Sequence, residues 1–177
     1  MMLKTHSMKL SVTALLVAGA FGCGTAAAAD IINDTRTGQQ TFSYETAEVR
    51  GSTLSNSSGS VIFANSSAVV NITGGNTITG SSYGVFANSD ATVNISGENT
   101  ITATGNSSYA VYANKNSTLT ISGENTISNT GGGYLVYGNG DSQGGSHISI
   151  GGNNTFTDAG SSSRGVYLNG SSTADIS

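Results

Sequence analysis

Residues 85–103 read VFANSDATVNISGENTITA, and this stretch holds one period of a pattern that recurs from Ile62 to the end of the chain. The pattern has three parts: Val-aromatic-small-Asn, a short alternating segment such as Val-Asn-Ile, and Gly-x-Asn-Thr-Ile. Successive copies start 23, 26, 25 and 30 residues apart, at Ile62, Val85, Val111, Val136 and Val166. A period of this length is typical of a repeat architecture in which each repeat is one structural unit.

The spacing within the repeat distinguishes strands from loops. The Ile of the second part always precedes the apolar residue of the third part by six residues, as Ile95 precedes Ile101. The gap from the third part to the next repeat varies between 7 and 10 residues, and the fourth repeat has an insertion at residues 141–146. Because surface loops tolerate changes in length, the variable gaps indicate loops and the constant spacing indicates strands joined by a fixed corner.

Each part alternates apolar with small polar residues and is rich in β-branched residues, which predicts three half-buried strands per repeat. Like strands recur one repeat apart, so they would pair best in parallel and in register, coil over coil. A meander of hairpins would instead favour Asn-Gly or Asp-Gly turns between strands. The sequence therefore predicts an all-β parallel β-helix of about four to five coils, each made of three short strands.

Stacked coils place equivalent residues in columns. We expect an inward column of isoleucines from the second part, and two columns of asparagines that form hydrogen bonds between coils. The absence of proline agrees with a fold in which every coil donates N–H groups to its neighbour. The isoleucine column consists of Ile72, Ile95, Ile121, Ile150 and Ile176. One asparagine column consists of Asn65, Asn88, Asn114, Asn139 and Asn169. The other consists of Asn76, Asn99, Asn125 and Asn154.

The first residues are typical of a targeting segment. Lys4 and Lys9 precede an apolar stretch at residues 10–21 and a small-residue run that ends at Ala29, as in a secretory signal peptide. The apolar stretch is short for a membrane span, and Cys23 leaves lipid attachment open as an alternative. We divide the chain into a signal peptide at 1–29, an N-terminal capping segment at 30–60 and β-helix repeats at 61–177, with an incomplete last coil.

Charge excludes some classes of partner. Without residues 1–29 the chain keeps four Lys or Arg against ten Asp or Glu, a net charge of −6. So acidic a chain cannot neutralise many phosphates, which argues against binding to nucleic acid or to anionic lipid. It also contains no cysteine after residue 29, so stability must come from packing and backbone pairing.

The signal-like start followed by repeats such as Val-Tyr-Ala-Asn, Val-Asn-Ile-Ser-Gly and Asn-Thr-Ile-Thr resembles the passenger of Gram-negative autotransporters, of the pertactin-like and self-associating adhesin types. The resemblance covers residues 61–177. It implies a right-handed parallel β-helix on the cell surface, exported through the outer membrane by a C-terminal barrel. The chain ends at Ser177 without such a barrel, so the resemblance implies an N-terminal fragment. Without the barrel, export would leave the chain in the periplasm.

Catalysis has few candidate residues. His147 is the one histidine after residue 29, and as a catalytic base it would need an orienting acid and a nucleophile. Asp141 and Ser142 are close to it in sequence, but a solvated loop histidine is the simpler interpretation. We therefore expect that the protein is not an enzyme. A truncated polysaccharide-active β-helix enzyme and a plain periplasmic structural protein remain as alternatives.

Acidic side chains offer one candidate for a cation site. Glu98 and Glu124 occupy equivalent repeat positions, and with Asp90 they could share a weakly held cation. The alternative is that both glutamates are exposed turn residues, and we expect neither a metal ion nor a cofactor.

A column of aromatic residues is the candidate binding surface. Alternation places it on the outward face if the Val-type positions fill the core. Such a stripe would suit contacts with a second copy of the chain or with carbohydrate or protein at a host or cell surface, whereas a half-buried stack that only adds stability is the alternative. The column consists of Phe63, Phe86, Tyr112, Tyr137 and Tyr167.

Overall fold

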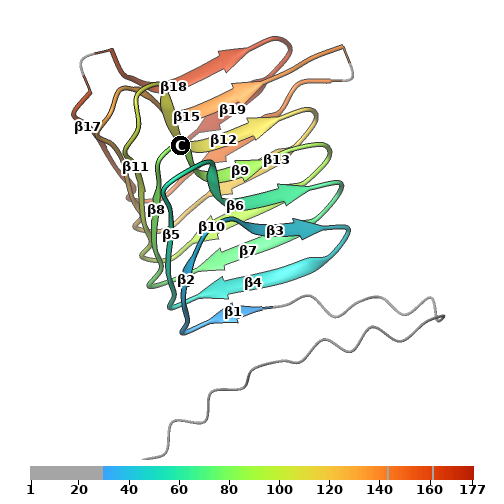
Figure 1. The fold of residues 1–177 in the computed structure, drawn as a ribbon. Helices are drawn as coiled ribbons and strands as arrows, with labels where there is room; N and C mark the ends of the chain where they lie inside the picture. The colour runs from blue at the N-terminus through green and yellow to red at the C-terminus, as the bar shows by residue number, and fades with distance from the viewer. Residues whose placement is uncertain (1–29, 143, 161) are drawn as a thin grey trace, which may run out of the picture.

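The computed structural model describes residues 30–142, 144–160 and 162–177, and in them the chain forms strands and no helix (Figure 1). The predicted signal peptide and Cys23 lie outside the described residues. The strands form three parallel sheets that stack as a β-solenoid of about five turns, which confirms the predicted fold class.

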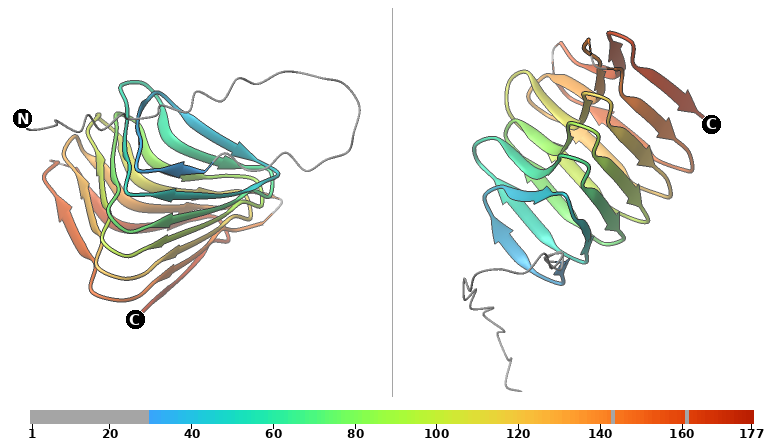
Figure 2. Two further views of the ribbon diagram at one scale, coloured as in Figure 1. Left: turned by 90° about the horizontal axis from the view of Figure 1, so that it is seen from below. Right: turned by 90° about the vertical axis from the view of Figure 1, so that its right-hand side faces the viewer.

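Each coil contributes one strand to each sheet, so the three sheets run side by side along the solenoid (Figure 2). Sheet A contains β1 (Ile31–Ile32), β4 (Thr46–Arg50), β7 (Val69–Thr73), β10 (Thr92–Ser96), β13 (Thr118–Ile121), β16 (His147–Ile150) and β19 (Thr173–Ile176). Sheet B contains β2 (Thr35–Thr37), β5 (Thr53–Asn56), β8 (Thr77–Gly80), β11 (Thr100–Ala103), β14 (Thr126–Asn129) and β17 (Thr155–Asp158). Sheet C contains β3 (Gln40–Ser43), β6 (Ser60–Asn65), β9 (Tyr83–Ala87), β12 (Ser108–Asn114), β15 (Gly133–Asn139) and β18 (Arg164–Asn169).

Residues 30–60 belong to the same three sheets. Strands β1, β2 and β3 lie at the N-terminal end of sheets A, B and C, and each pairs in parallel with the strand one coil later. Phe42 points into the core and is 3% exposed, whereas Tyr44 is 82% exposed. Regular strand pairing thus begins at Ile31, about thirty residues before the first repeat that the sequence pattern identifies.

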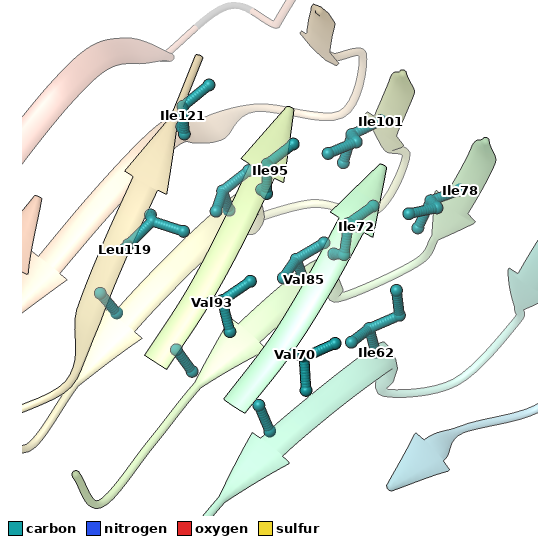
Figure 3. Close-up of a cluster of buried hydrophobic side chains, with 14 of the residues drawn as sticks. Ile62, Val70, Ile72, Ile78, Val85, Val93, Ile95, Ile101, Leu119 and Ile121 are labelled. Carbon is teal, nitrogen blue, oxygen red and sulfur yellow. The ribbon is translucent and has the colours of Figure 1, made fainter. Parts of the chain in front are cut away.

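The core is a set of apolar columns along the solenoid axis (Figure 3). In sheet A, Ile72, Ile95, Ile121 and Ile150 occupy successive register positions and are at most 5% exposed. Ile176 continues this column in β19, where it is 64% exposed because β19 is the last member of sheet A. The predicted isoleucine column is therefore confirmed, with its final member uncovered.

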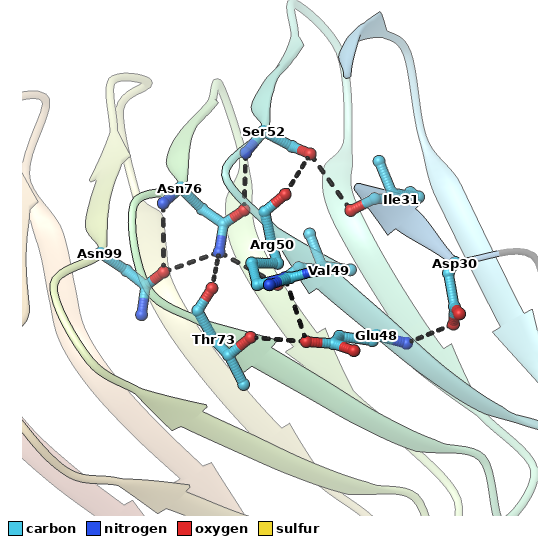
Figure 4. Close-up of polar contacts among 9 residues, drawn as sticks. All are labelled: Asp30, Ile31, Glu48, Val49, Arg50, Ser52, Thr73, Asn76 and Asn99. Carbon is cyan, nitrogen blue, oxygen red and sulfur yellow. Dashed lines mark hydrogen bonds and ion pairs between the residues drawn. The ribbon is translucent and has the colours of Figure 1, made fainter. Parts of the chain in front are cut away.

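Both predicted asparagine columns form hydrogen-bonded ladders at the corners between sheets. The Asn76 side chain accepts from the Ser52 backbone N–H at 3.0 Å and donates to Asn99 Oδ1 at 2.7 Å (Figure 4). Asn99 in turn donates to Asn125 at 2.8 Å, and Asn125 to Asn154 at 2.8 Å. These amides satisfy buried backbone groups that the turn would otherwise leave without a partner, which explains why this corner keeps a constant length.

Glycine stacking fixes the same corner. Gly97 has φ +84°, and a Cβ atom there would lie 2.9 Å from the backbone of Gly74 in the coil before it. Gly123 stacks on Gly97 in the same way. Neither the dihedral angle nor the space suits a larger residue, so each coil can approach the next at normal strand spacing only with glycine here.

Candidate functional site

The outward face of sheet C carries the predicted aromatic column. Its members are register partners in five successive strands, and every ring is partly buried. Neighbouring ring centroids lie 5.1, 4.6, 5.0 and 5.5 Å apart along the series Phe63, Phe86, Tyr112, Tyr137 and Tyr167.

A second aromatic column lies beside the first. Tyr83, Tyr109 and Tyr134 are register partners in β9, β12 and β15, and Arg164 takes the equivalent position in β18. The ring centroids are 5.3 Å apart at both steps between these tyrosines. We call the eight rings of the two columns the aromatic surface.

Sequence reasoning missed the second column because it assumed strict alternation. In β9 both Gly84 and Val85 are buried, and they separate the outward rings of Tyr83 and Phe86 by three positions. The sequence carried a signal for this arrangement, namely a tyrosine two residues before the repeated valine in three successive repeats.

The two columns contact each other as well as their own members. Tyr109 lies 5.2 Å from Tyr112 and 5.1 Å from Tyr137, measured between ring centroids. Some rings of adjacent coils stack nearly in parallel, with interplanar angles of 8° for Tyr83 and Tyr109 and 13° for Phe86 and Tyr112, whereas the steps from Phe63 to Phe86 and from Tyr112 to Tyr137 are tilted by 44° and 58°. Much of each ring face is therefore covered by a neighbouring ring, and the accessible part consists of ring edges and phenol groups.

The hydroxyl groups of Tyr109 and Tyr112 stay uncharged over the physiological pH range. Burial raises the pKa of Tyr112 to about 12, with a further contribution from the neighbouring tyrosines Tyr137, Tyr83 and Tyr109. Burial also raises the pKa of Tyr109, for the same reasons. These hydroxyl groups can therefore donate and accept hydrogen bonds at any ordinary pH.

Arg164 ends the second column with a positive charge. Its guanidinium carbon lies 4.9 Å from the ring centroid of Tyr167 and 5.6 Å from that of Tyr134, which is the range of cation–π contacts. A pocket of about 340 Å³ opens next to it, between the loops that lead from sheet B to sheet C. The pocket is lined by Asn106, Ser107, Gly131, Gly132, Gly133, Tyr134, Ser162 and Arg164.

The other two sheets present polar outward faces. Sheet B carries a repeated Thr-x-Thr or Thr-x-Ser pattern on successive strands, for example Thr77 and Thr79 on β8 and Thr100 and Thr102 on β11. Sheet A carries Thr, Asn and Ser at most of its outward positions, including Asn94, which donates to Asn71 at 2.9 Å. The aromatic residues are therefore concentrated on one side of the solenoid.

The structure places His147 at the start of β16, immediately after the insertion. Its Nδ1 lies 2.9 Å from Thr173 Oγ1, and its Nε2 lies 3.6 Å from Asp175 Oδ2, both on the neighbouring strand β19. The acid that lies beside this histidine is Asp175. Asp175 is 79% exposed and His147 48% exposed, as side chains that pair across an open sheet surface.

The acidic residues that could have shared a cation are placed at exposed turns. Glu98 and Glu124 are exposed, and Asp90 accepts a hydrogen bond from the Asn116 side chain at 2.7 Å. Within residues 30–142, 144–160 and 162–177, no group of three His, Cys, Asp or Glu side chains is arranged to hold a metal ion.

Comparison with known proteins adds no relative, since no family model, no curated protein and no solved structure matches this chain. In the described part of the chain there is no helix of the length and apolar character needed to cross a membrane.

Proposed function

We propose that this protein is a passenger-type β-solenoid of the autotransporter kind, exported to the cell surface, which acts in adhesion or self-association through the aromatic surface. The signal-like residues 1–29 and the repeat pattern support export and the passenger assignment. The parallel solenoid supports a scaffold whose long faces, rather than a single cleft, make the contacts.

The observation that carries the proposal is the concentration of eight partly exposed rings on one face of sheet C. Contiguous exposed apolar patches mark interaction sites, and tyrosine is enriched in protein interfaces because it combines an apolar ring with a hydrogen-bonding group. On the described strands of sheets A and B, the outward positions hold no phenylalanine or tyrosine and offer mainly small hydroxyl and amide groups.

Among possible partners, the periodicity of the surface favours a second copy of the same chain. Its rings repeat once per coil, so the matching face of another solenoid offers the same spacing over its whole length. Two such faces can meet around a twofold axis, where each contact occurs twice. Many weak ring-edge and hydroxyl contacts then add up along the solenoid, as expected for reversible association.

The experiment uses beads coated with purified residues 30–177, which contain the described strands β1 to β19. All proteins carry Leu168→Lys/Ile176→Lys, which opposes association through the exposed strands β18 and β19. We expect coated beads to clump and the added double substitution Tyr112→Thr/Tyr137→Thr to reduce clumping severalfold. The matched control, Thr102→Ala/Ser128→Ala, changes the same two coils on the face of sheet B. The proposal is contradicted if the control loses clumping as strongly, or if the tyrosine variant clumps normally while its circular dichroism is unchanged.

A further inference from the structure

We propose that the pocket beside Arg164 binds a carboxylate-bearing pyranose sugar, such as a uronic acid residue of an acidic glycan. The site lies at one end of the aromatic surface and shares Tyr134 with it, but every residue of its lining comes from one copy of the chain. A titration with a single sugar therefore succeeds or fails regardless of the clumping assay.

The wall of the pocket that Gly131, Gly132 and Gly133 form is firmly packed. A Cβ atom on Gly131 would collide with the carbonyl oxygen of Gly105, and one on Gly133 with that of Ser108. The loop of residues 130–132 is thus packed directly on the loop one coil before it. Asn129 also fixes this loop, because its Oδ1 accepts hydrogen bonds from the backbone N–H groups of Gly131 at 3.1 Å and Gly132 at 3.2 Å. A preorganised loop loses little entropy when a ligand binds.

The size and lining of the pocket fit a monosaccharide. Its volume of about 340 Å³ lies at the lower end of the range for small-molecule sites. Asn106, Ser107 and Ser162 supply side chains that can donate and accept hydrogen bonds, as sugar hydroxyls require. Tyr134 adds an aromatic side chain to the lining, which can contact the apolar C–H groups of a pyranose.

Charge selects an acidic sugar over a neutral one. Arg164 is the charged group of the lining, and none of the ion pairs found in the described residues involves it. Its guanidinium carbon lies 5.6 Å from the ring centroid of Tyr134 and 4.9 Å from that of Tyr167, and these contacts favour a position of the charge beside the pocket. Asp158 precedes the loop that leads from β17 to Arg164 in β18. Its side chain accepts a hydrogen bond from the backbone N–H of Gly160 at 3.1 Å. A planar guanidinium with free donors is well suited to two parallel hydrogen bonds with a carboxylate.

The test titrates the purified protein with sodium glucuronate and follows saturation-transfer NMR signals of the ligand. We expect a Kd on the order of 1 mM, the range in which one charge-assisted pair and a few neutral contacts place a small ligand. Glucose should bind about ten- to a hundredfold more weakly, because it lacks the carboxylate. Arg164→Gln should weaken glucuronate by a similar factor and Arg164→Lys by less, since lysine keeps the charge but not the fork.

Two controls make the result decisive. Lys115→Gln removes another exposed positive charge, outside the pocket, and should leave the affinity for glucuronate unchanged. Sodium acetate and a short peptide with one glutamate test the carboxylate without the sugar ring, and both should bind at least tenfold more weakly than glucuronate. The proposal is overturned if glucuronate does not bind, if acetate or the peptide binds as well, or if Lys115→Gln weakens binding as much as Arg164→Gln.

Discussion

The inward isoleucine column allows one substitution to be compared in two environments that differ only in coverage. Ile121 has no exposed surface and lies between Ile95 and Ile150 in the register of sheet A. Ile176 occupies the same column but is 64% exposed. Replacement by alanine removes the same atoms at both positions, so the difference in stability reports how much each side chain is packed.

The expected magnitudes follow from burial. Ile121→Ala should lower the free energy of unfolding by about 3 kcal/mol, within the range for fully buried isoleucine, because the coils on both sides limit relaxation of the cavity. Ile176→Ala should cost about 1 kcal/mol, since only about a third of that residue is covered. Ile121→Asp should cost more than either, because it places a carboxylate in the core without a partner.

Urea unfolding followed by circular dichroism measures these differences, with the three variants and the parent protein compared under identical conditions. Equal losses for Ile121→Ala and Ile176→Ala would refute the reasoning, because both positions would then be packed alike. A melting curve for Ile121→Asp that matches the parent protein would show that the side chain does not lie in the core.

Three further predictions concern the corner ladder, the aromatic surface and the C-terminal end. Asn125→Ala should lower the free energy of unfolding in urea by about 1–3 kcal/mol, because buried N–H donors of Asn99 lose their acceptor. Asn94→Ala on the outward face should lower it by less, and equal losses would contradict the role of the ladder. Because the pKa of Tyr112 is raised to about 12 in the folded state, the unfolded chain ionises first, so the contribution of Tyr112 to stability should be constant below pH 10 and fall between pH 10 and about 12. The thermal midpoint measured against pH over this alkaline range checks the prediction, and Tyr112→Phe should reduce the fall. Sedimentation should show that residues 30–177 associate through β17, β18 and β19, where Phe156, Leu168 and Ile176 are exposed, and that this association depends little on salt. Leu168→Lys/Ile176→Lys should restore the monomer at protein concentrations of about tens of micromolar. A parent chain that is already monomeric at these concentrations would contradict the prediction.

The fold could be predicted from the sequence because successive coils use the same strands and corners, so the same residue types recur at equivalent positions. The constant six-residue step from Ile95 to Ile101 reflects a corner in which Asn99 and Gly97 must contact their equivalents in the next coil. Variable gaps fell in loops, as predicted. Residues 30–60 were not identified as repeats, because their strands pair in parallel like those of the repeats but their sequence lacks the Asn-Thr-Ile motif.

The candidate site was predicted only in part, for a local reason. Alternation identifies the column from Phe63 to Tyr167, but it fails where Gly84 and Val85 are both buried and Tyr83 returns to the outward face. The pocket beside Arg164 depends on loops from three coils, and no single repeat indicates which loop residues will meet. Columns can thus be predicted from a repeat, whereas pockets between coils require the structure.

The central claim, that the aromatic surface makes the contacts, is tested most directly by tyrosine footprinting of clumped and dispersed beads. Tyr44 is 82% exposed and lies outside the aromatic surface, so it serves as the internal reference. Nitration measured by mass spectrometry should fall on clumping at Tyr109, Tyr112 and Tyr137 and stay unchanged at Tyr44. Unchanged nitration at those three tyrosines in clumped beads, or protection confined to Tyr44, would contradict the claim.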